Sequence, residues 1–181
     1  MNRVVITGMG AITPIGNDIE TFWNNLIAGK NGIGKITHFD TEGFKATLAA
    51  EVKDFEPTDY IEKKEARKMD RFCQFALAAA CQAMEQSGIT AENTDPYRFG
   101  TIVGSGIGGM ETFCDEFEKY FTKGPGRVSP FFIPTMISNM AAARISMRFG
   151  AKGDSYCPVT ACSSGAHAIG EAFRLIRHGY A

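Results

Sequence analysis

One cysteine stands among small side chains at a point where the sequence pattern changes. It is the centre of the run Val159-Thr160-Ala161-Cys162-Ser163-Ser164-Gly165. Residues 154–158 before this run are extended in character, whereas apolar residues recur at three- and four-residue spacing over 166–177 after it. That spacing is the period of one helix face. The pattern therefore predicts that Cys162 lies where a strand ends and a helix begins.

Such a position suits a nucleophilic thiol. The N–H groups at a helix start are unpaired and carry partial positive charge, so a thiol there loses its proton more easily. The small neighbours Ala161 and Ser163 to Gly165 let a substrate carbonyl approach the sulfur, and the same N–H groups can hold the oxyanion formed on attack. From this pattern alone, an activated cysteine and a plain buried core thiol both remain open.

The run around Cys162 resembles the active-site motif of the β-ketoacyl-acyl carrier protein synthases, most closely the elongating type, synthase II. Three further blocks resemble that family, in the same order along the chain. They are Val4 to Gly10 with Pro14-Ile15-Gly16, Gly104 to Gly109, and Pro130 to Pro134. The resemblance extends over the whole chain, and four ordered blocks are far more specific than any single one.

The resemblance implies an α/β protein with the thiolase-like fold, whose layers follow the order α-β-α-β-α. Residues 1–181 would be the N-terminal part of a ketoacyl synthase domain, truncated after the active-site cysteine helix, and would supply most of its N-terminal half. Family synthases are more than twice as long, and two histidines and a lysine from their second half complete the site. Residues 1–181 alone are therefore expected to be inactive.

The implied activity is that of a 3-oxoacyl-[acyl carrier protein] synthase, an acyltransferase of fatty acid elongation. Cys162 would hold an acyl chain as a thioester, and malonyl-carrier protein would lose carbon dioxide and attack it. Ala161, Ile107 and Phe132 would line the acyl pocket, and Phe132 would reach across the interface of a homodimer. No cofactor is implied. The alternatives are a polyketide ketoacyl synthase, a non-catalytic partner resembling a chain-length factor, and an initiating synthase or thiolase.

Residues 63–71 form the densest basic stretch of the chain. If this stretch is one continuous helix, Lys64, Arg67, Lys68 and Arg71 share one side of it. The sequence allows either a solvated helix face or a docking surface for an acidic partner. The resemblance implies docking of acyl carrier protein, which is strongly acidic. The expected docking residues are Lys63, Lys64, Arg67, Lys68 and Arg127.

The glycines of the block Gly104 to Gly109 have the pattern Gly104-x-Gly106-x-x-Gly109, which formally matches the dinucleotide-binding fingerprint. A Rossmann site would also need a second strand soon afterwards that ends in an acidic residue. Gly124-Pro125-Gly126-Arg127 follows instead. We therefore favour glycines that let the backbone pass close to a substrate or another element, with a nucleotide-binding module as the alternative.

Apolar patterning and turn residues predict the remaining elements. Buried strands are expected at 3–7, 99–103 and 154–158, and residues 32–58 are expected to be loop-like. Helices are expected from Asp18 to Gly29, Lys63 to Ser87, Met110 to Phe121 and Pro134 to Gly150. Cys73 and Cys81 lie on the apolar stripe of the second helix and are expected to be core thiols. Strands alternating with helices predict a parallel sheet covered on both faces.

The composition fits a soluble globular protein. Of the 181 residues 44% are hydrophobic and 22% are charged, and the net charge of −1 gives no general attraction to nucleic acid or anionic membranes. The five cysteines have neither a disulfide pattern nor zinc spacing with histidine, so no metal is expected. No apolar run is long enough to cross a membrane, and no signal peptide is visible. We therefore expect a cytoplasmic protein.

None of the three histidines is assigned to catalysis. His38 is expected in a loop and His178 at a helix end. His167 follows Cys162 by five residues, which corresponds to about 140° around a helix axis. Its side chain is therefore expected to point away from the sulfur.

Overall fold

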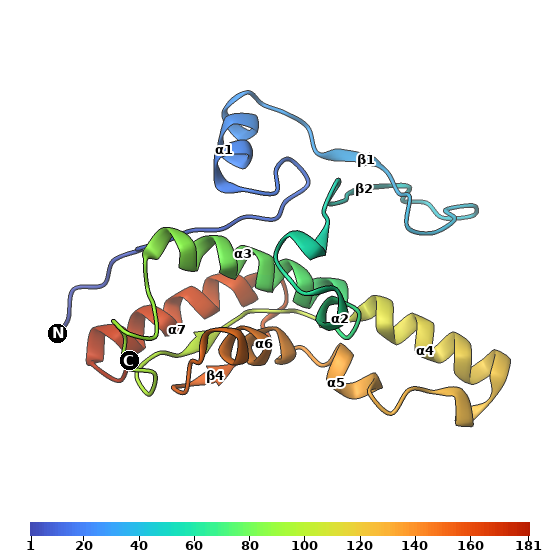
Figure 1. The fold of residues 1–181 in the computed structure, drawn as a ribbon. Coiled ribbons are helices and arrows are strands. Elements are labelled where there is room, and N and C mark those ends of the chain that lie inside the picture. Colours follow the sequence, from blue (N-terminus) through green and yellow to red (C-terminus); the bar gives the residue numbers. More distant parts are fainter.

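Helices make up most of the regular secondary structure of the chain, and its strands are short (Figure 1). The computed structural model describes residues 1–181. The strands are β1 (Ile33–Lys35), β2 (Leu48–Ala50), β3 (Thr101–Ile102) and β4 (Ser155–Tyr156). The longer helices are α1 (Ile19–Ile27), α3 (Arg71–Ser87), α4 (Met110–Lys123), α6 (Met140–Phe149) and α7 (Ser164–His178). Shorter helical pieces are η1 (Pro57–Asp59), α2 (Lys63–Ala66), η2 (Pro125–Arg127), α5 (Phe132–Met136) and η3 (Ala161–Ser163).

The core lies where α3 packs on α6. Its buried apolar residues are Ile61, Ala66, Leu77 and Ile145, and Val103 packs against them from the end of β3. Strand β3 contacts both α6 and α7, so two different helices pack against the parallel pair of strands. Helices α4 and α5 extend from this body together, at the right of Figure 1.

Two of the three expected strands are confirmed, in shorter form. Strands β3 and β4 are parallel, with Thr101 opposite Ser155 and Ile102 opposite Tyr156. The strand expected at residues 3–7 is wrong, because this segment pairs with no strand and Ile6 is 81% exposed. A strand needs a neighbour for its backbone N–H and C=O groups, and among residues 1–181 none lies beside this segment. The expected sheet therefore consists of one parallel pair.

The loop-like interpretation of residues 32–58 is wrong in part. Strands β1 and β2 form an antiparallel pair within it, with Gly34 opposite Ala49. The strands are too short to give a clear alternating pattern, which explains why the sequence did not reveal them.

Helix boundaries follow local capping chemistry. Asp18 caps α1 by accepting a hydrogen bond from the Thr21 N–H at 2.7 Å, as expected of an N-cap aspartate. Gly88 and Gly150 end α3 and α6 with positive φ angles of 65° and 68°, a conformation that glycine adopts without steric cost. These ends were predicted.

Two expected helices are each divided, and both predictions are corrected. The helix expected over 63–87 is interrupted after Ala66, because Asp70 caps a new helix by accepting from the Phe72 N–H at 3.2 Å. The helix expected from Pro134 begins earlier, at Phe132, and is interrupted at Ile137, whose backbone is extended. Asp70 was therefore a cap signal inside an otherwise helical pattern.

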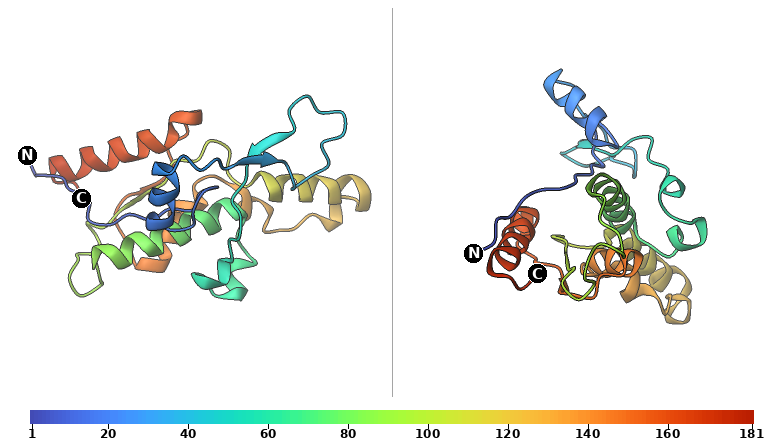
Figure 2. Two further views of the ribbon diagram at one scale, coloured as in Figure 1. Left: turned by 90° about the horizontal axis from the view of Figure 1, so that it is seen from above. Right: turned by 60° about the vertical axis from the view of Figure 1, so that its left-hand side comes forward.

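Several helices leave apolar side chains uncovered among residues 1–181, and α1 and α7 are two of them. Helix α1 has no buried residue, and Trp23 is 57% exposed. On α7 the buried residues are Ser164 and Ala168, whereas Ile169 on the predicted apolar face is 72% exposed. Figure 2 shows α1 projecting from the rest of the chain. None of the helices is both long and apolar enough to span a membrane.

Candidate active site

A tight turn presents Cys162 directly before α7. Ala161 has a positive φ of 51°, which is uncommon for a residue with a Cβ and costs on the order of 1–3 kcal/mol. The Ser164 hydroxyl supports this turn: it donates to the Ala161 carbonyl at 2.7 Å and accepts from the Thr160 N–H at 2.9 Å. Ser164 is itself buried. The turn places Cys162 in η3, two residues before Ser164 begins α7, in agreement with the helix start that the sequence predicted.

The five cysteines are all free, but they differ in exposure. Cys162 and Cys114 are exposed, Cys81 and Cys157 are partly buried, and Cys73 is buried. Burial raises the pKa of the Cys73 thiol to about 12 and also raises the pKa of Cys81. Both are core thiols, as predicted, whereas Cys162 is not buried within residues 1–181.

The glycine loop after β3 packs directly on the cysteine turn. A Cβ at Gly104 would clash with the Ser164 carbonyl oxygen and lie 2.7 Å from the Gly165 nitrogen. A Cβ at Gly106 would lie 3.6 Å from the Ala161 oxygen, an ordinary contact. Gly104 therefore serves close packing against the protein's own backbone, the interpretation that we favoured, whereas Gly106 has room for a Cβ. A phosphate-binding loop would instead turn its N–H groups toward a ligand.

The end of this loop is held against two other segments. Gly108 has a positive φ of 85°, and a Cβ there would clash with the Met136 carbonyl oxygen. The Gly109 N–H donates to the same oxygen at 2.7 Å. Ile107, between these contacts and the cysteine turn, has a side chain that is 68% exposed. The structure therefore brings the loop of Ile107 against the turn that carries Ala161 and Cys162.

Phe132 lies apart from this group. It begins α5 and packs toward α4, with its ring centroid 6.1 Å from that of Phe113 and 6.4 Å from that of Phe117. Within residues 1–181 its aromatic partners are therefore on α4 and not at the cysteine turn.

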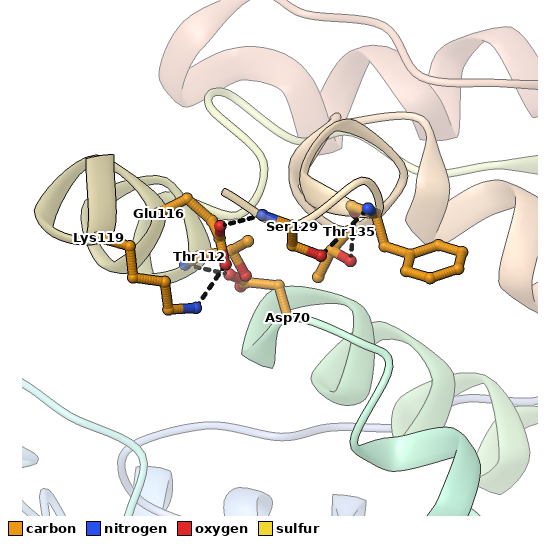
Figure 3. Close-up of polar contacts among 7 residues, drawn as sticks. Asp70, Thr112, Glu116, Lys119, Ser129 and Thr135 are labelled. Carbon is orange, nitrogen blue, oxygen red and sulfur yellow. Dashed lines mark hydrogen bonds and ion pairs between the residues drawn. The ribbon is translucent and has the colours of Figure 1, made fainter. Parts of the chain in front are cut away.

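A hollow of about 580 Å³ lies where α4 and α5 meet the turn before α3. Arg67, Lys68 and Arg144 contribute positive charge to its lining, and Phe131 and Phe132 contribute rings. Cys162 does not line it. Figure 3 shows the carboxylates that bind backbone beside it: Asp70 accepts from the Thr112 N–H at 2.9 Å and Glu116 from the Ser129 N–H at 2.7 Å. Hydrogen bonds from the Lys119 ammonium group and the Ser129 N–H hold the pKa of Glu116 below its usual range.

The basic residues do not share one helix face, and that prediction is corrected. Lys63 and Lys64 lie on α2, whereas Arg67 and Lys68 lie in the turn before α3. Arg71 lies over the rings of Phe55 and Phe75, at 5.9 and 5.0 Å from their centroids. Lys68 pairs with Glu65 at 3.0 Å. The four basic residues 63, 64, 67 and 68 are all exposed, as is Arg127 on η2.

His167 has polar contacts with neighbours other than Cys162. Its Nδ1 is 3.5 Å from the Thr160 hydroxyl oxygen, and its Nε2 is 3.9 Å from a Glu171 carboxylate oxygen. The Arg174 guanidinium holds the pKa of Glu171 below its usual range. No group of three or more His, Cys, Asp or Glu side chains is arranged to hold a metal ion.

Comparison with known proteins decides the family. All 181 residues match the family described as Beta-ketoacyl synthase, N-terminal domain. The chain belongs to the β-ketoacyl synthase family. This confirms the resemblance that the blocks around Cys162, Gly104 and Pro130 indicated.

Named relatives in the β-ketoacyl synthase family cover the chain almost completely. It is 50% identical over 177 residues to a "3-oxoacyl-[acyl-carrier-protein] synthase 2" of Staphylococcus aureus (strain N315), which is 98% of this chain and 43% of that protein. The enzyme of the same name from Synechocystis sp. is 47% identical over 179 residues, 99% of this chain and 43% of that protein. The chain therefore spans less than half the length of these relatives.

Solved structures agree on the ketosynthase fold. The ishigamide ketosynthase/chain length factor superposes with a TM-score of 0.86 at 30% identity, over 97% of this chain and 44% of that one. A β-ketoacyl synthase from Burkholderia phymatum gives 0.77 at 28% identity, over 99% and 44%. The α/β, thiolase-like fold class is thus confirmed, and this chain contains part of that fold.

Sequence reasoning overlooked three side chains around the hollow. Asp70 and Glu116 are buried carboxylates that bind backbone N–H groups of other segments, and Arg144 contacts both Glu65 and the Lys68 carbonyl. Asp70 lies in the basic stretch 63–71 and Glu116 lies among other charged residues of α4, so the neighbouring sequence did not mark either carboxylate as buried.

Proposed function

We propose that residues 1–181 are the N-terminal part of a 3-oxoacyl-[acyl carrier protein] synthase that elongates acyl chains in cytoplasmic fatty acid biosynthesis. One observation supports this most: an exposed cysteine on a supported turn before α7, in a chain 50% identical over nearly its whole length to a synthase of that name. Five free cysteines are usual in a reducing compartment such as the cytoplasm.

The proposed reaction begins with Cys162. Its thiolate attacks the thioester carbonyl of an acyl chain on acyl carrier protein, so a new C–S bond forms, the carrier C–S bond breaks, and the carrier leaves as a thiolate that takes up the proton released by Cys162. N–H groups at the start of α7 would stabilise the oxyanion. Malonyl-carrier protein then loses carbon dioxide, and its C2 carbanion attacks the acyl-Cys162 carbonyl. The Cys162 thiolate leaves, and the product is a 3-oxoacyl chain two carbons longer.

The acyl pocket is proposed to include Ala161, Ile107 and Phe132. Ala161 neighbours the nucleophile, and Ile107 projects from the loop packed on the same turn. Phe132 would join the pocket of a second copy in a homodimer. Exposed apolar side chains on α4 and α5, including Phe121 and Ile133, support such an interface.

Acyl carrier protein is the proposed partner, and its docking surface is the exposed basic set on α2, the following turn and η2. Carrier proteins are acidic, so the interaction would be electrostatic and sensitive to salt. The proposed docking residues are Lys63, Lys64, Arg67, Lys68 and Arg127.

The test follows the mass of the full-length protein that contains this chain. After incubation with acyl-carrier protein its mass should increase by one acyl group, and Cys162→Ala should show no increase. Adding malonyl-carrier protein should then release the acyl group as a 3-oxoacyl product two carbons longer. An equal mass increase in Cys162→Ala would contradict the proposal.

A polyketide ketoacyl synthase is the second candidate, because the ishigamide ketosynthase/chain length factor shares 30% identity with this chain. The same assay separates the two. A fatty acid synthase yields one condensation and stops until the keto group is reduced, whereas a polyketide synthase extends the unreduced product again. A non-catalytic partner would acquire no acyl group.

A further inference from the structure

We infer that Asp70 is a positioning residue for acyl-chain selection: its carboxylate joins the starts of α3 and α4 and thereby fixes the loop that carries Ile107. The inference rests on the proposed function, because the position of Ile107 affects selection only if Cys162 accepts an acyl chain.

The Asp70 carboxylate is shared between two helices. Asp70 is 6% exposed. One oxygen accepts from the Phe72 N–H at 3.2 Å, which caps α3, and the other accepts from the Thr112 N–H at 2.9 Å, in the first turn of α4 (Figure 3). Both donors are N–H groups that a helix start leaves unpaired, and a charged acceptor makes such bonds stronger. A single side chain therefore joins the starts of two helices, through a bond between residues 42 positions apart in sequence.

The same contact controls the end of the glycine loop. Gly109 immediately precedes α4, and a Cβ there would lie 2.7 Å from the second Asp70 oxygen. On its other side, the Gly109 N–H donates to the Met136 carbonyl at 2.7 Å. The start of α4 is thus held between Asp70 and Met136.

The other end of the loop is held by the cysteine turn. Gly104 packs against the backbone of Ser164 and Gly165 so closely that no Cβ fits. Between these two anchored ends, the Gly108 N–H donates to the Ser105 hydroxyl at 3.1 Å. Ile107 makes no comparable anchor and is 68% exposed. The distance of Ile107 from Cys162 is therefore set by the two anchored ends of the loop, and Asp70 holds the end at Gly109.

Serine at position 70 would separate the two roles of the carboxylate. Serine and aspartate are similarly good N-caps, so Asp70→Ser retains the cap of α3. It has one side-chain oxygen where aspartate has two, so the bond to Thr112 is lost. Asp70→Asn is a second variant with nearly the same volume, and its single acceptor oxygen cannot bind both N–H groups, so the link between the two helices is lost. Asp18→Ser is the matched control, since Asp18 caps α1 through the Thr21 N–H at 2.7 Å and binds no N–H group of another helix.

The experiment uses the full-length protein that contains this chain. Acylation of Cys162 by octanoyl- and palmitoyl-carrier protein is followed by intact mass, and thermal unfolding is measured in parallel. We expect both Asp70 variants to change the ratio of the two specificity constants by about threefold or more. A threefold change is small compared with the roughly 10–200-fold by which one methylene group changes substrate discrimination in an apolar pocket. Asp18→Ser should leave the ratio unchanged.

Three results would overturn the inference, and they are distinguishable. An unchanged ratio in a folded Asp70 variant would show that the carboxylate does not affect selection. Loss of the folded state in both Asp70 variants, with Asp18→Ser folded, would make Asp70 a stability residue only. Absence of any acyl-enzyme in the unsubstituted protein would overturn the proposed function itself, and this inference with it.

Discussion

The surroundings of each thiol separate a candidate nucleophile from packing residues. Cys73 is 2% exposed, and burial raises its pKa to about 12. Cys162 is exposed and sits in a turn supported by two hydrogen bonds of Ser164. Cys114 is also exposed, but it lies within α4, where N–H groups are already paired. The chain thus contains one exposed thiol at a helix start.

We predict that limiting iodoacetamide labels Cys162 of the full-length protein first. The thiolate is the reacting form, and each pKa unit changes its fraction tenfold. Since the pKa of Cys73 is about 12 instead of the ordinary 9.0, Cys73 should react on the order of a thousandfold more slowly than an ordinary thiol. Peptide mass spectrometry after partial labelling measures the order. Faster labelling of Cys114 or Cys157 would argue against Cys162 as the nucleophile.

Cys73 also predicts a loss of stability in alkali. The folded protein keeps the Cys73 proton until about pH 12, whereas the unfolded chain releases it near 9.0. Between these values the unfolded state binds fewer protons, so the free energy of unfolding falls as pH rises above about 9. Urea midpoints at pH 7 to 10 should therefore decrease less in Cys73→Ala than in the unsubstituted protein. The same slope in both proteins would remove Cys73 as the cause.

The glycine loop and the cysteine turn form a single packed element, although they are far apart in sequence. A Cβ at Gly104 would clash with backbone atoms of Ser164, and backbone atoms cannot rotate away as side chains do. At Gly106 the nearest atom is 3.6 Å from the added Cβ. Two glycines of one motif therefore differ sharply in their tolerance of a side chain.

This difference can be measured by alanine substitution. Gly104→Ala should destabilise the full-length protein by about 1–3 kcal/mol or more, as overpacking does, and should slow Cys162 acylation because the turn must shift. Gly106→Ala should remain within about 1 kcal/mol of the original. Urea unfolding and intact-mass acylation test both variants. Equal effects would mean that the loop does not pack as described.

The basic residues should act through charge despite lying on two elements. Changing Lys64, Arg67 and Lys68 to glutamate should raise KM for carrier-protein substrates by about tenfold or more, since like charges across an interface cost several kcal/mol. Acylation by a small thioester without carrier protein should be unchanged. The ion pair of Lys68 with Glu65 is exposed, so its loss should hardly affect stability.

A matched charge reversal provides the control for this patch. Lys30, Lys35 and Lys45 are exposed in or beside the β1–β2 hairpin, and their change to glutamate alters the net charge equally. This second triple variant should leave KM unchanged. If the two variants weaken carrier-protein substrates equally, or if the small thioester is also affected, the basic set is not a specific dock.

Apolar surfaces of the chain remain exposed outside its buried core. The apolar sides of α1 and α7 are uncovered, and the chain spans 43% of the length of its relatives. The apolar stripe of α7 was predicted correctly from its period, and within residues 1–181 it is uncovered because no element of these residues lies over it.

We predict that residues 1–181 alone do not catalyse condensation. Decarboxylation requires groups that stabilise the developing enolate, and His167 contacts Thr160 and Glu171 instead of facing the thiol. The measurement compares the expressed chain, its Cys162→Ala variant and the full-length protein for 3-oxoacyl formation. Turnover by the chain above that of Cys162→Ala would show that it contains a complete site.

Local chemistry explains which features could be read from the sequence. The Asp18 cap, the glycine ends of α3 and α6, and the place of Cys162 before α7 depend on hydrogen bonds and dihedral preferences within a few residues. The family resemblance rested on ordered motifs of the same local kind.

Other features depend on atoms that meet only in the folded chain. Residues 3–7 have the composition of a strand but no strand to pair with. Asp70 could be recognised as a cap, yet its second bond depends on Thr112. The requirement for glycine at 104 comes from Ser164, and no residue near Gly104 in sequence indicates it. Steric exclusion and shared hydrogen bonds act over a few ångströms, so the folding of distant segments onto one another decides where they apply.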